Sequence, residues 1–151
     1  MSLYLDGRTS QNASILNSIA IPTTSSYVLW GVVGLDVGAA NPLLGPIRVQ
    51  FDGTITFGLS PGAINPINTL EIKVVRGNDP NVPSIYTLTK SLTTINAGIP
   101  EVFTFTGSDY NPPQESGFLI YSVFIRNITG ASESDVIRRG PESFNASAIG
   151  N

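Results

Sequence analysis

Turn-forming residues divide this chain into segments that are too short for ordinary helices. Its 151 residues include 15 glycines and 11 prolines. No window of helical length has an apolar stripe of 3.6-residue period without a glycine or a proline in it. Between the turns, apolar residues tend to alternate with a period of two, which is typical of strands. The sequence therefore predicts an all-β protein.

The alternating segments predict about eight strands. They lie at residues 27–35, 46–51, 55–59, 70–76, 84–92, 101–106, 117–127 and 142–149. A chain of this length buries roughly 68 to 70% of the surface that it exposes when unfolded. We expect one antiparallel β-sandwich of the jelly-roll type with an N-terminal extension. Residues 1–26 form the predicted arm and linker, and residues 27–151 form the predicted sandwich.

The apolar positions on both sides of Asp52-Gly53 share one phase. All six are odd-numbered: Ile47, Val49, Phe51, Ile55, Phe57 and Leu59. A two-residue turn would send the second three to the opposite face, so that register is disfavoured. A hairpin with a three-residue connection, Asp52-Gly53-Thr54, keeps all six on one buried face. A single long strand through Gly53 would also keep the phase and remains an alternative.

The predicted core collects the large apolar side chains of these segments. It consists of Trp30, Val49, Phe51, Ile55, Phe57, Phe103, Phe105, Tyr121 and Phe124. Residues 118–125 are apolar on both faces, which is typical of a strand covered on both sides. Another chain or segment, or a long loop of the same chain, would cover the second face.

The N-terminal 26 residues differ from the rest because polar stretches flank a short β-prone segment, residues 15–21, which ends at Pro22. The candidate assembly residues here are Leu3, Leu5, Ile15, Leu16, Ile19 and Ile21. Two interpretations are open: a ninth strand that closes an edge of its own sandwich, or an arm that pairs with a neighbouring subunit. The second predicts that residues 1–22 are dispensable for folding but needed for assembly.

The chain has no cysteine and no histidine. Disulfides, thiolate chemistry and histidine-based catalysis are therefore excluded, and we expect no enzyme, no catalytic residue, no metal and no cofactor. Asp79 and Asp109 lie in clusters with asparagines and could bind Ca²⁺, but these clusters are more typical of turns. Glu133 and Asp135 could act as a glycosidase pair, yet no aromatic platform is near them in sequence.

Charge and hydropathy limit the partners. Eleven acidic and eight basic side chains give a net charge of -3, and the basic ones are scattered, so nucleic acid is not an expected partner. No segment approaches the roughly 20 apolar residues of a membrane span. Asp6 and Arg8 interrupt the apolar stretch that a secretory signal would need, so we expect no signal peptide.

Several segments carry a resemblance to a known group of proteins. They are VQFDGTITFGL (residues 49–59), LEIKVVRGNDP (70–80), FTFTGSDYNPP (103–113), GFLIYSVFIRN (117–127) and RRGPESFNASA (138–148). Over residues 27–149 the chain resembles the small jelly-roll proteins of endospore-forming Firmicutes that are described as exosporium or spore-surface proteins. The chain lacks the cysteines that cross-link the related spore-appendage subunits, so any fibre would be held by non-covalent contacts.

The resemblance implies a structural subunit at a spore surface or elsewhere outside the cell. We expect a self-assembling component of a fibre, appendage or exosporium layer, held by β-strand pairing between copies. Its partners would be copies of itself, as a fibre or trimer, and other spore-surface proteins. The alternatives are a surface-displayed carbohydrate- or Ca²⁺-binding module and a phage or virion structural protein.

Overall fold

The computed structural model describes residues 2–60, 62–63, 67–93, 99–129 and 135–151. Within these ranges the chain forms nine strands and one short 3₁₀-helix. These are β1 (Leu3–Ala13), β2 (Ile21–Pro22), β3 (Val28–Asp36), η1 (Pro42–Leu44), β4 (Arg48–Leu59), β5 (Ile67–Arg76), β6 (Tyr86–Thr93), β7 (Glu101–Tyr110), β8 (Phe118–Asn127) and β9 (Val136–Gly150). No helix in the described part of the chain has the length and hydropathy needed to cross a membrane.

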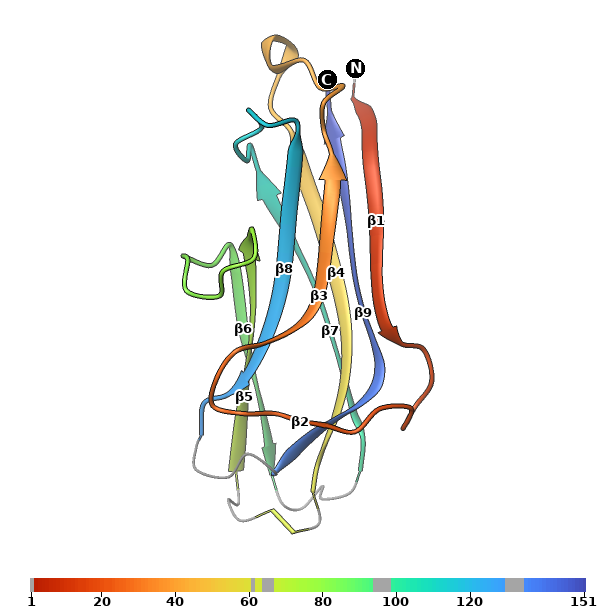
Figure 1. Cartoon of the computed structure of the whole chain (residues 1–151), viewed down its shortest axis with the longest axis vertical. Coiled ribbons are helices and arrows are strands. Elements are labelled where there is room, and N and C mark those ends of the chain that lie inside the picture. Colours follow the sequence, from red (N-terminus) through yellow and green to blue (C-terminus); the bar gives the residue numbers. More distant parts are fainter. Residues whose placement is uncertain (1, 61, 64–66, 94–98, 130–134) are drawn as a thin grey trace.

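The strands form two antiparallel sheets that pack face to face (Figure 1). Sheet A has the order β1-β9-β4-β7, with β2 also paired to β9, and sheet B has the order β3-β8-β5-β6. Apart from β2 and the β5-β6 hairpin, successive strands change sheets, which is the connectivity of a jelly roll. The predicted all-β, jelly-roll sandwich is therefore confirmed.

Strand β4 runs without a break through Gly53, so the predicted hairpin at Asp52-Gly53-Thr54 is wrong and the single long strand is correct. The six odd-numbered apolar side chains do share one face, and each is buried between the sheets. Gly53 is needed here for space, because a Cβ atom would lie 2.5 Å from the ring of Phe105 and 3.1 Å from Trp30. The glycine that indicated a turn instead makes room for two aromatic rings.

Most of the predicted core residues lie in the central hydrophobic cluster. Trp30, Val49, Phe51, Ile55, Phe57, Phe105 and Tyr121 are all part of it. Phe103 is half-buried against that cluster. Phe124 is also buried, but it lies on the outer face of sheet B, where its ring centroid is 6.2 Å from that of Tyr27.

The N-terminal segment belongs to the sandwich, which differs from the predicted boundary after residue 26. Strand β1 pairs with β9 from Leu3 opposite Gly150 to Ala13 opposite Glu142, and Ile21 of β2 pairs with Arg138. Leu5 packs against the core and Ile19 is half-buried. Leu3, Ile15 and Leu16 are exposed. Strand β1 therefore closes an edge of its own sheet, whereas the predicted β-prone segment, residues 15–21, is a connection in which only Ile21 belongs to a strand.

Side chains of β1 also cover the free edge of β3 in the other sheet. Asp6 Oδ2 accepts a hydrogen bond from the Asp36 amide at 2.8 Å, and Ser10 Oγ accepts one from the Val32 amide at 3.3 Å. Asn12 Nδ2 donates to the Trp30 carbonyl oxygen. These bonds satisfy backbone groups of an edge strand that would otherwise be open to pairing.

The outer face of β8 is partly covered by the connection between β5 and β6. Ser122 Oγ donates to the Gly77 carbonyl at 2.6 Å, and the Gly77 amide donates to the Ile120 carbonyl at 2.8 Å. Lys73 Nζ donates to the Pro80 carbonyl at 2.6 Å, which holds the loop against the sheet. A loop of the same chain therefore covers one part of this face and leaves another part exposed.

Candidate functional site

An exposed apolar surface lies on the outer face of sheet B, over β3 and β8. We call it the apolar strip and define it by Leu29, Val32, Phe118 and Ile120. The exposed fractions are 48% for Leu29, 44% for Val32 and 49% for Phe118, and Ile120 is half-buried. The strand register places them along one pair of strands. On β3, Leu29 lies opposite Phe124 and Val32 opposite Ser122; on β8, Ile120 lies opposite Gly34.

A glycine leaves room for the largest side chain of the strip. Phe118 is opposite Asp36 in the register, but its ring lies over the adjacent Gly34. A Cβ atom at Gly34 would be 2.5 Å from this ring. The ring therefore bridges β8 and β3, and any larger residue at position 34 would displace it.

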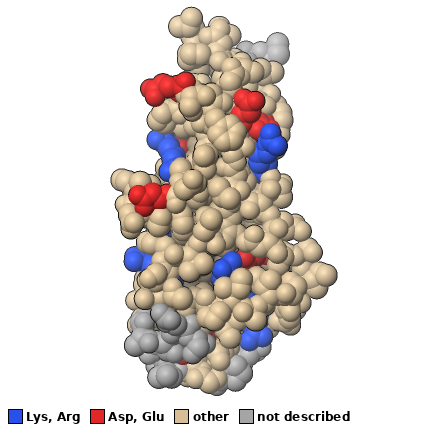
Figure 2. Space-filling model, viewed as in Figure 1, with Lys and Arg blue, Asp and Glu red and all other residues tan. Residues whose placement is uncertain are grey.

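Charged groups surround the strip rather than interrupt it. Figure 2 shows this side of the molecule with charged side chains mainly near its margins and a mixed pair below the centre. At one end of the strip, Arg126 Nε donates to Glu71 Oε1 at 3.0 Å, and the Arg126 guanidinium lies 4.3 Å from the ring centroid of Tyr27. At the other end is Asp36.

The carboxylate of Glu71 is stabilised in its charged form. Partial burial would raise its pKa, but hydrogen bonds from Tyr27 and Arg126, together with the charge of Arg126, outweigh burial and lower the pKa. Desolvation, followed by the hydrogen bond to Glu71 and the charge of Glu71, raises the pKa of the Tyr27 hydroxyl, and the charge of Arg126 opposes this shift. Glu71 therefore stays ionised at neutral pH and holds Arg126 at the end of the strip.

The aspartates that could have bound Ca²⁺ have other contacts. Asp109 receives two hydrogen bonds of 2.7 Å from Arg76 and one of 2.8 Å from the Tyr121 hydroxyl. Asp79 Oδ1 accepts from the Asn81 amide at 2.8 Å, as in an Asx turn. No group of three or more acidic, cysteine or histidine side chains suited to a metal occurs among the described residues. Glu133, of the predicted carboxylate pair, lies outside them, and Asp135 is buried.

A buried ion pair lies within β9. Arg138 and Glu142 are 3% and 0% exposed, and Arg138 Nε donates to Glu142 Oε2 at 3.0 Å. Asn12 Nδ2 of β1 donates to Glu142 Oε1 at 2.9 Å. The pair spans the position where the register between β4 and β9 shifts, so its hydrogen bonds join the two sides of this irregular part of the strand.

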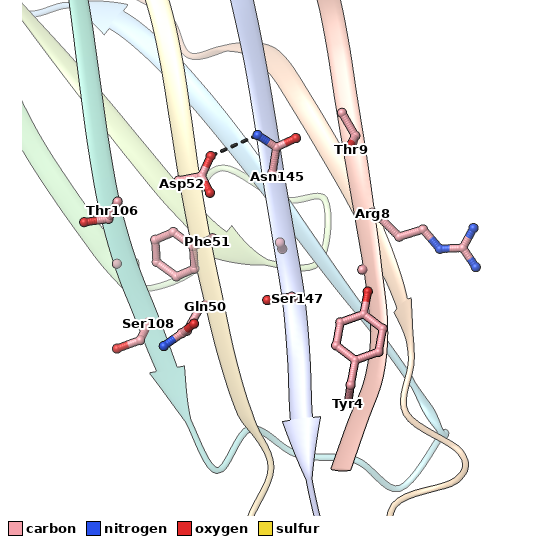
Figure 3. A pocket seen from close by; sticks show the side chains of 13 residues that line it. Tyr4, Arg8, Thr9, Gln50, Phe51, Asp52, Thr106, Ser108, Asn145 and Ser147 are labelled. Atoms are coloured by element: carbon pink, nitrogen blue, oxygen red, sulfur yellow. Dashed lines mark hydrogen bonds between the residues drawn. The ribbon is translucent and has the colours of Figure 1, made fainter. Parts of the chain in front are cut away.

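A second surface feature is a shallow hollow of about 900 Å³ on the outer face of sheet A (Figure 3). We call it the polar hollow. Short polar side chains of β1, β9, β4 and β7 line it, among them Ser147, Gln50 and Ser108. Asn145 Nδ2 of β9 donates to Asp52 Oδ1 of the adjacent strand β4 at 2.9 Å. The outer face of sheet A thus carries a polar region, whereas that of sheet B carries the apolar strip.

Comparison with known proteins gives likeness in fold alone. No protein-family model and no curated protein matches the chain. A chain from the T13 viral particle of IBDV is similar with a TM-score of 0.52 and 9% identity, over 98% of this chain and 34% of the viral one. This protein therefore spans about a third of that chain, and the likeness supports a shared sandwich architecture.

Two further solved structures are more distant. The infectious bursal disease virus Gx strain structure gives a TM-score of 0.47 at 10% identity, over 96% of this chain and 32% of the viral one. Murine APRIL at pH 5.0 gives 0.47 at 12% identity, over 94% and 98% of the two chains.

The residues predicted for assembly are not brought together into one surface. Leu5 packs inward, Leu3 lies at the start of β1, and Ile15 and Leu16 lie in the connection after it. The second apolar face of residues 118–125 was predicted to be covered by another chain, a segment or a loop, but the β3 part of the apolar strip, Leu29 and Val32, was not predicted. The signal for β8 was that residues 118–125, apart from Ser122, are apolar or aromatic, which places such side chains on both faces of the strand.

Proposed function

We propose that the protein is a structural subunit that assembles with copies of itself through the apolar strip. The observation that carries this proposal is that three large apolar side chains, each about half exposed, lie next to one another on a hydrogen-bonded sheet. Contiguous apolar patches on soluble proteins commonly mark interaction surfaces. Burying such a surface contributes roughly 25 cal/mol for each Å² removed from water.

The charges at the ends of the strip favour a second copy as the partner. If two sheets B pack face to face with their strands antiparallel, the Asp36 end of each copy lies against the Arg126 end of the other. Such a contact is isologous, because the same surface patch is used on both subunits. Stacked sheets lie about 10 Å apart, which is the room that one layer of side chains from each partner fills.

The setting that we propose is a layer, fibre or appendage at a spore or cell surface. The resemblance of residues 49–59, 70–80, 103–113, 117–127 and 138–148 to spore-surface proteins supports it. A virion structural protein is the second candidate. The likeness to a chain of the IBDV viral particle supports this alternative at the level of the fold.

The test is the oligomeric state of a variant that places a charge in the strip. We expect the wild-type protein to associate in sedimentation velocity as its concentration rises, and the variant Val32→Lys to remain monomeric. Thr89→Lys is the matched control, because Thr89 is exposed on the same sheet but lies on the edge strand β6, away from the strip. Wild-type protein that stays monomeric at all concentrations, or Val32→Lys that associates normally, would contradict the proposal.

A further inference from the structure

The polar hollow has an unusual composition for the outer face of a sheet. Two neighbouring cross-strand rows supply Ser147, Gln50 and Ser108, and then Asn145, Asp52 and Thr106. Exposed strand positions often carry long lysine, arginine or glutamate side chains, but Asp52 is the single charge in these two rows. The side chains of these two rows are short and polar, and they leave the hollow open.

An aromatic ring stands at one margin of the hollow. Tyr4 of β1 is 64% exposed, and its phenol group lies over Gly7, where any Cβ atom would collide with the phenolic oxygen. Gly7 therefore leaves the space that this position of the ring requires. The adjacent Arg8 points away from the hollow and pairs with Asp6 at 3.1 Å, so its charge is directed elsewhere (Figure 3).

The chemistry of these groups selects the class of ligand. Hydroxyl and amide side chains both donate and accept hydrogen bonds, as the hydroxyls of a sugar do. An anion would meet the carboxylate of Asp52, and an apolar ligand would leave many polar groups without partners. A tyrosine ring offers an apolar face with a polar tip, which suits the C–H face of a sugar ring. We infer that the polar hollow binds an uncharged oligosaccharide.

The site is rigid before the ligand arrives. Its side chains stand on four strands that are hydrogen-bonded to one another, and the Asn145–Asp52 hydrogen bond restricts two of them. This order reduces the entropy cost of binding. The hollow is open on one side and buries only one face of a ligand, so we expect dissociation constants in the range of roughly 10 µM to 1 mM.

This inference goes beyond the proposed function and stands independently of it. The hollow is on the outer face of sheet A and the apolar strip is on the outer face of sheet B. Subunits that pair through the strip would leave the hollows on the outside of the assembly. A self-assembling structure of this kind would display many weak glycan sites, and their multivalency would raise the overall avidity.

The experiment is a screen of the full chain on a printed array of neutral and acidic oligosaccharides, followed by calorimetric titration with the neutral oligosaccharide that gives the strongest signal. We expect binding to at least one neutral oligosaccharide. Thr106→Lys fills the hollow and Tyr4→Ala removes the ring, and each is expected to weaken binding by roughly tenfold or more. Tyr4→Phe keeps the ring and should change the affinity by less than about threefold.

The controls separate this site from the assembly surface. Thr89→Lys adds the same charge to the other sheet and should bind the oligosaccharide as the wild-type protein does. Val32→Lys should also bind it normally, whatever its oligomeric state. Circular dichroism melting curves show whether each variant is folded. The inference is overturned if no neutral oligosaccharide binds at millimolar concentration, or if folded Thr106→Lys and Tyr4→Ala both bind with wild-type affinity.

Discussion

At the scale of single residues, Thr56 and Phe57 show that both faces of β4 are buried near its end. They are consecutive and point to opposite sides of sheet A, yet each is 0% exposed. Phe57 lies in the core between the sheets, whereas Thr56 Oγ1 is buried with no hydrogen-bond partner among the described residues. Two neighbouring side chains of equal burial should therefore respond in opposite directions to substitution.

We expect Phe57→Ala to lower the free energy of unfolding by about 3 to 5 kcal/mol, because it leaves a cavity in the core. Thr56→Val should leave that free energy unchanged or raise it, because an unpaired buried hydroxyl costs about 1 to 3 kcal/mol. Urea titration of both variants measures the two changes. A large loss of stability in Thr56→Val would show that its hydroxyl has a partner.

Tyr121 makes the stability sensitive to alkaline pH. Desolvation, followed by its hydrogen bond to Asp109, raises the pKa of the Tyr121 hydroxyl well above its ordinary value of 10.0. The folded state therefore keeps a proton that the unfolded state loses, and the free energy of unfolding falls as the pH rises above about 10. Below pH 10 this contribution is fully present.

The variant Tyr121→Phe removes the titrating group. It should be less stable than the wild-type protein at pH 7, because Asp109 loses a buried hydrogen bond of 2.8 Å. Its stability should fall less steeply between about pH 10 and 12. Denaturant titrations at several pH values measure both slopes, and equal slopes would assign the alkaline effect to other groups.

At the scale of strands, the sequence predicted those whose side chains alternate between core and solvent. The sequence did not predict strand β1, because its residues 6, 8 and 10 are polar and show no apolar alternation. These positions face the edge of β3 instead of the core, where Asp6 and Ser10 accept hydrogen bonds from backbone amides. A strand that closes the corner of a sandwich therefore carries no apolar alternation. Gly53 wrongly indicated a turn for a related reason. A glycine is needed there because the ring of Phe105, which is distant in sequence, occupies the space of a side chain.

The candidate sites were harder to predict than the strands. The apolar strip depends on the loop after β5, which covers Ser122 but leaves Val32 and Phe118 exposed. The polar hollow combines residues of β1, β4, β7 and β9. Single positions such as Ser147 and Thr106 have no chemical signature in sequence, and only the register between strands places them together.

Strand β1 gives a test of the N-terminal segment. A chain that starts at Thr23 lacks β1 and β2, so β9 loses two partners and β3 loses the side chains that cover its edge. We expect this truncated chain to lose its cooperative thermal transition in circular dichroism. The hypothesis of a dispensable arm predicts the opposite result, a folded chain that no longer assembles. The full chain, diluted to low concentration, is the control and should remain folded.

At the scale of the whole molecule, the two outer faces differ in the forces that they offer to a partner. Sheet B presents apolar side chains at Leu29, Val32 and Phe118, and sheet A presents hydroxyl and amide groups. Association through sheet B would be driven by removal of apolar surface from water. Contacts on sheet A would depend on hydrogen bonds. Conditions that change one kind of interaction should therefore leave the other nearly unchanged.

Salt separates these forces in the assembled protein. If the apolar strip forms the contact, raising NaCl from about 0.05 to 1 M should change the dissociation constant of the oligomer only a few fold, because screening acts only on the charges at the ends of the strip. Ammonium sulfate should strengthen association, since it is excluded from apolar surface. The heat capacity change of association should be negative. Sedimentation equilibrium and dilution calorimetry measure these quantities, with Val32→Lys as the control. A steep loss of association in NaCl would mean that pairs such as Asp36 and Arg126, and not the apolar side chains, hold the subunits together.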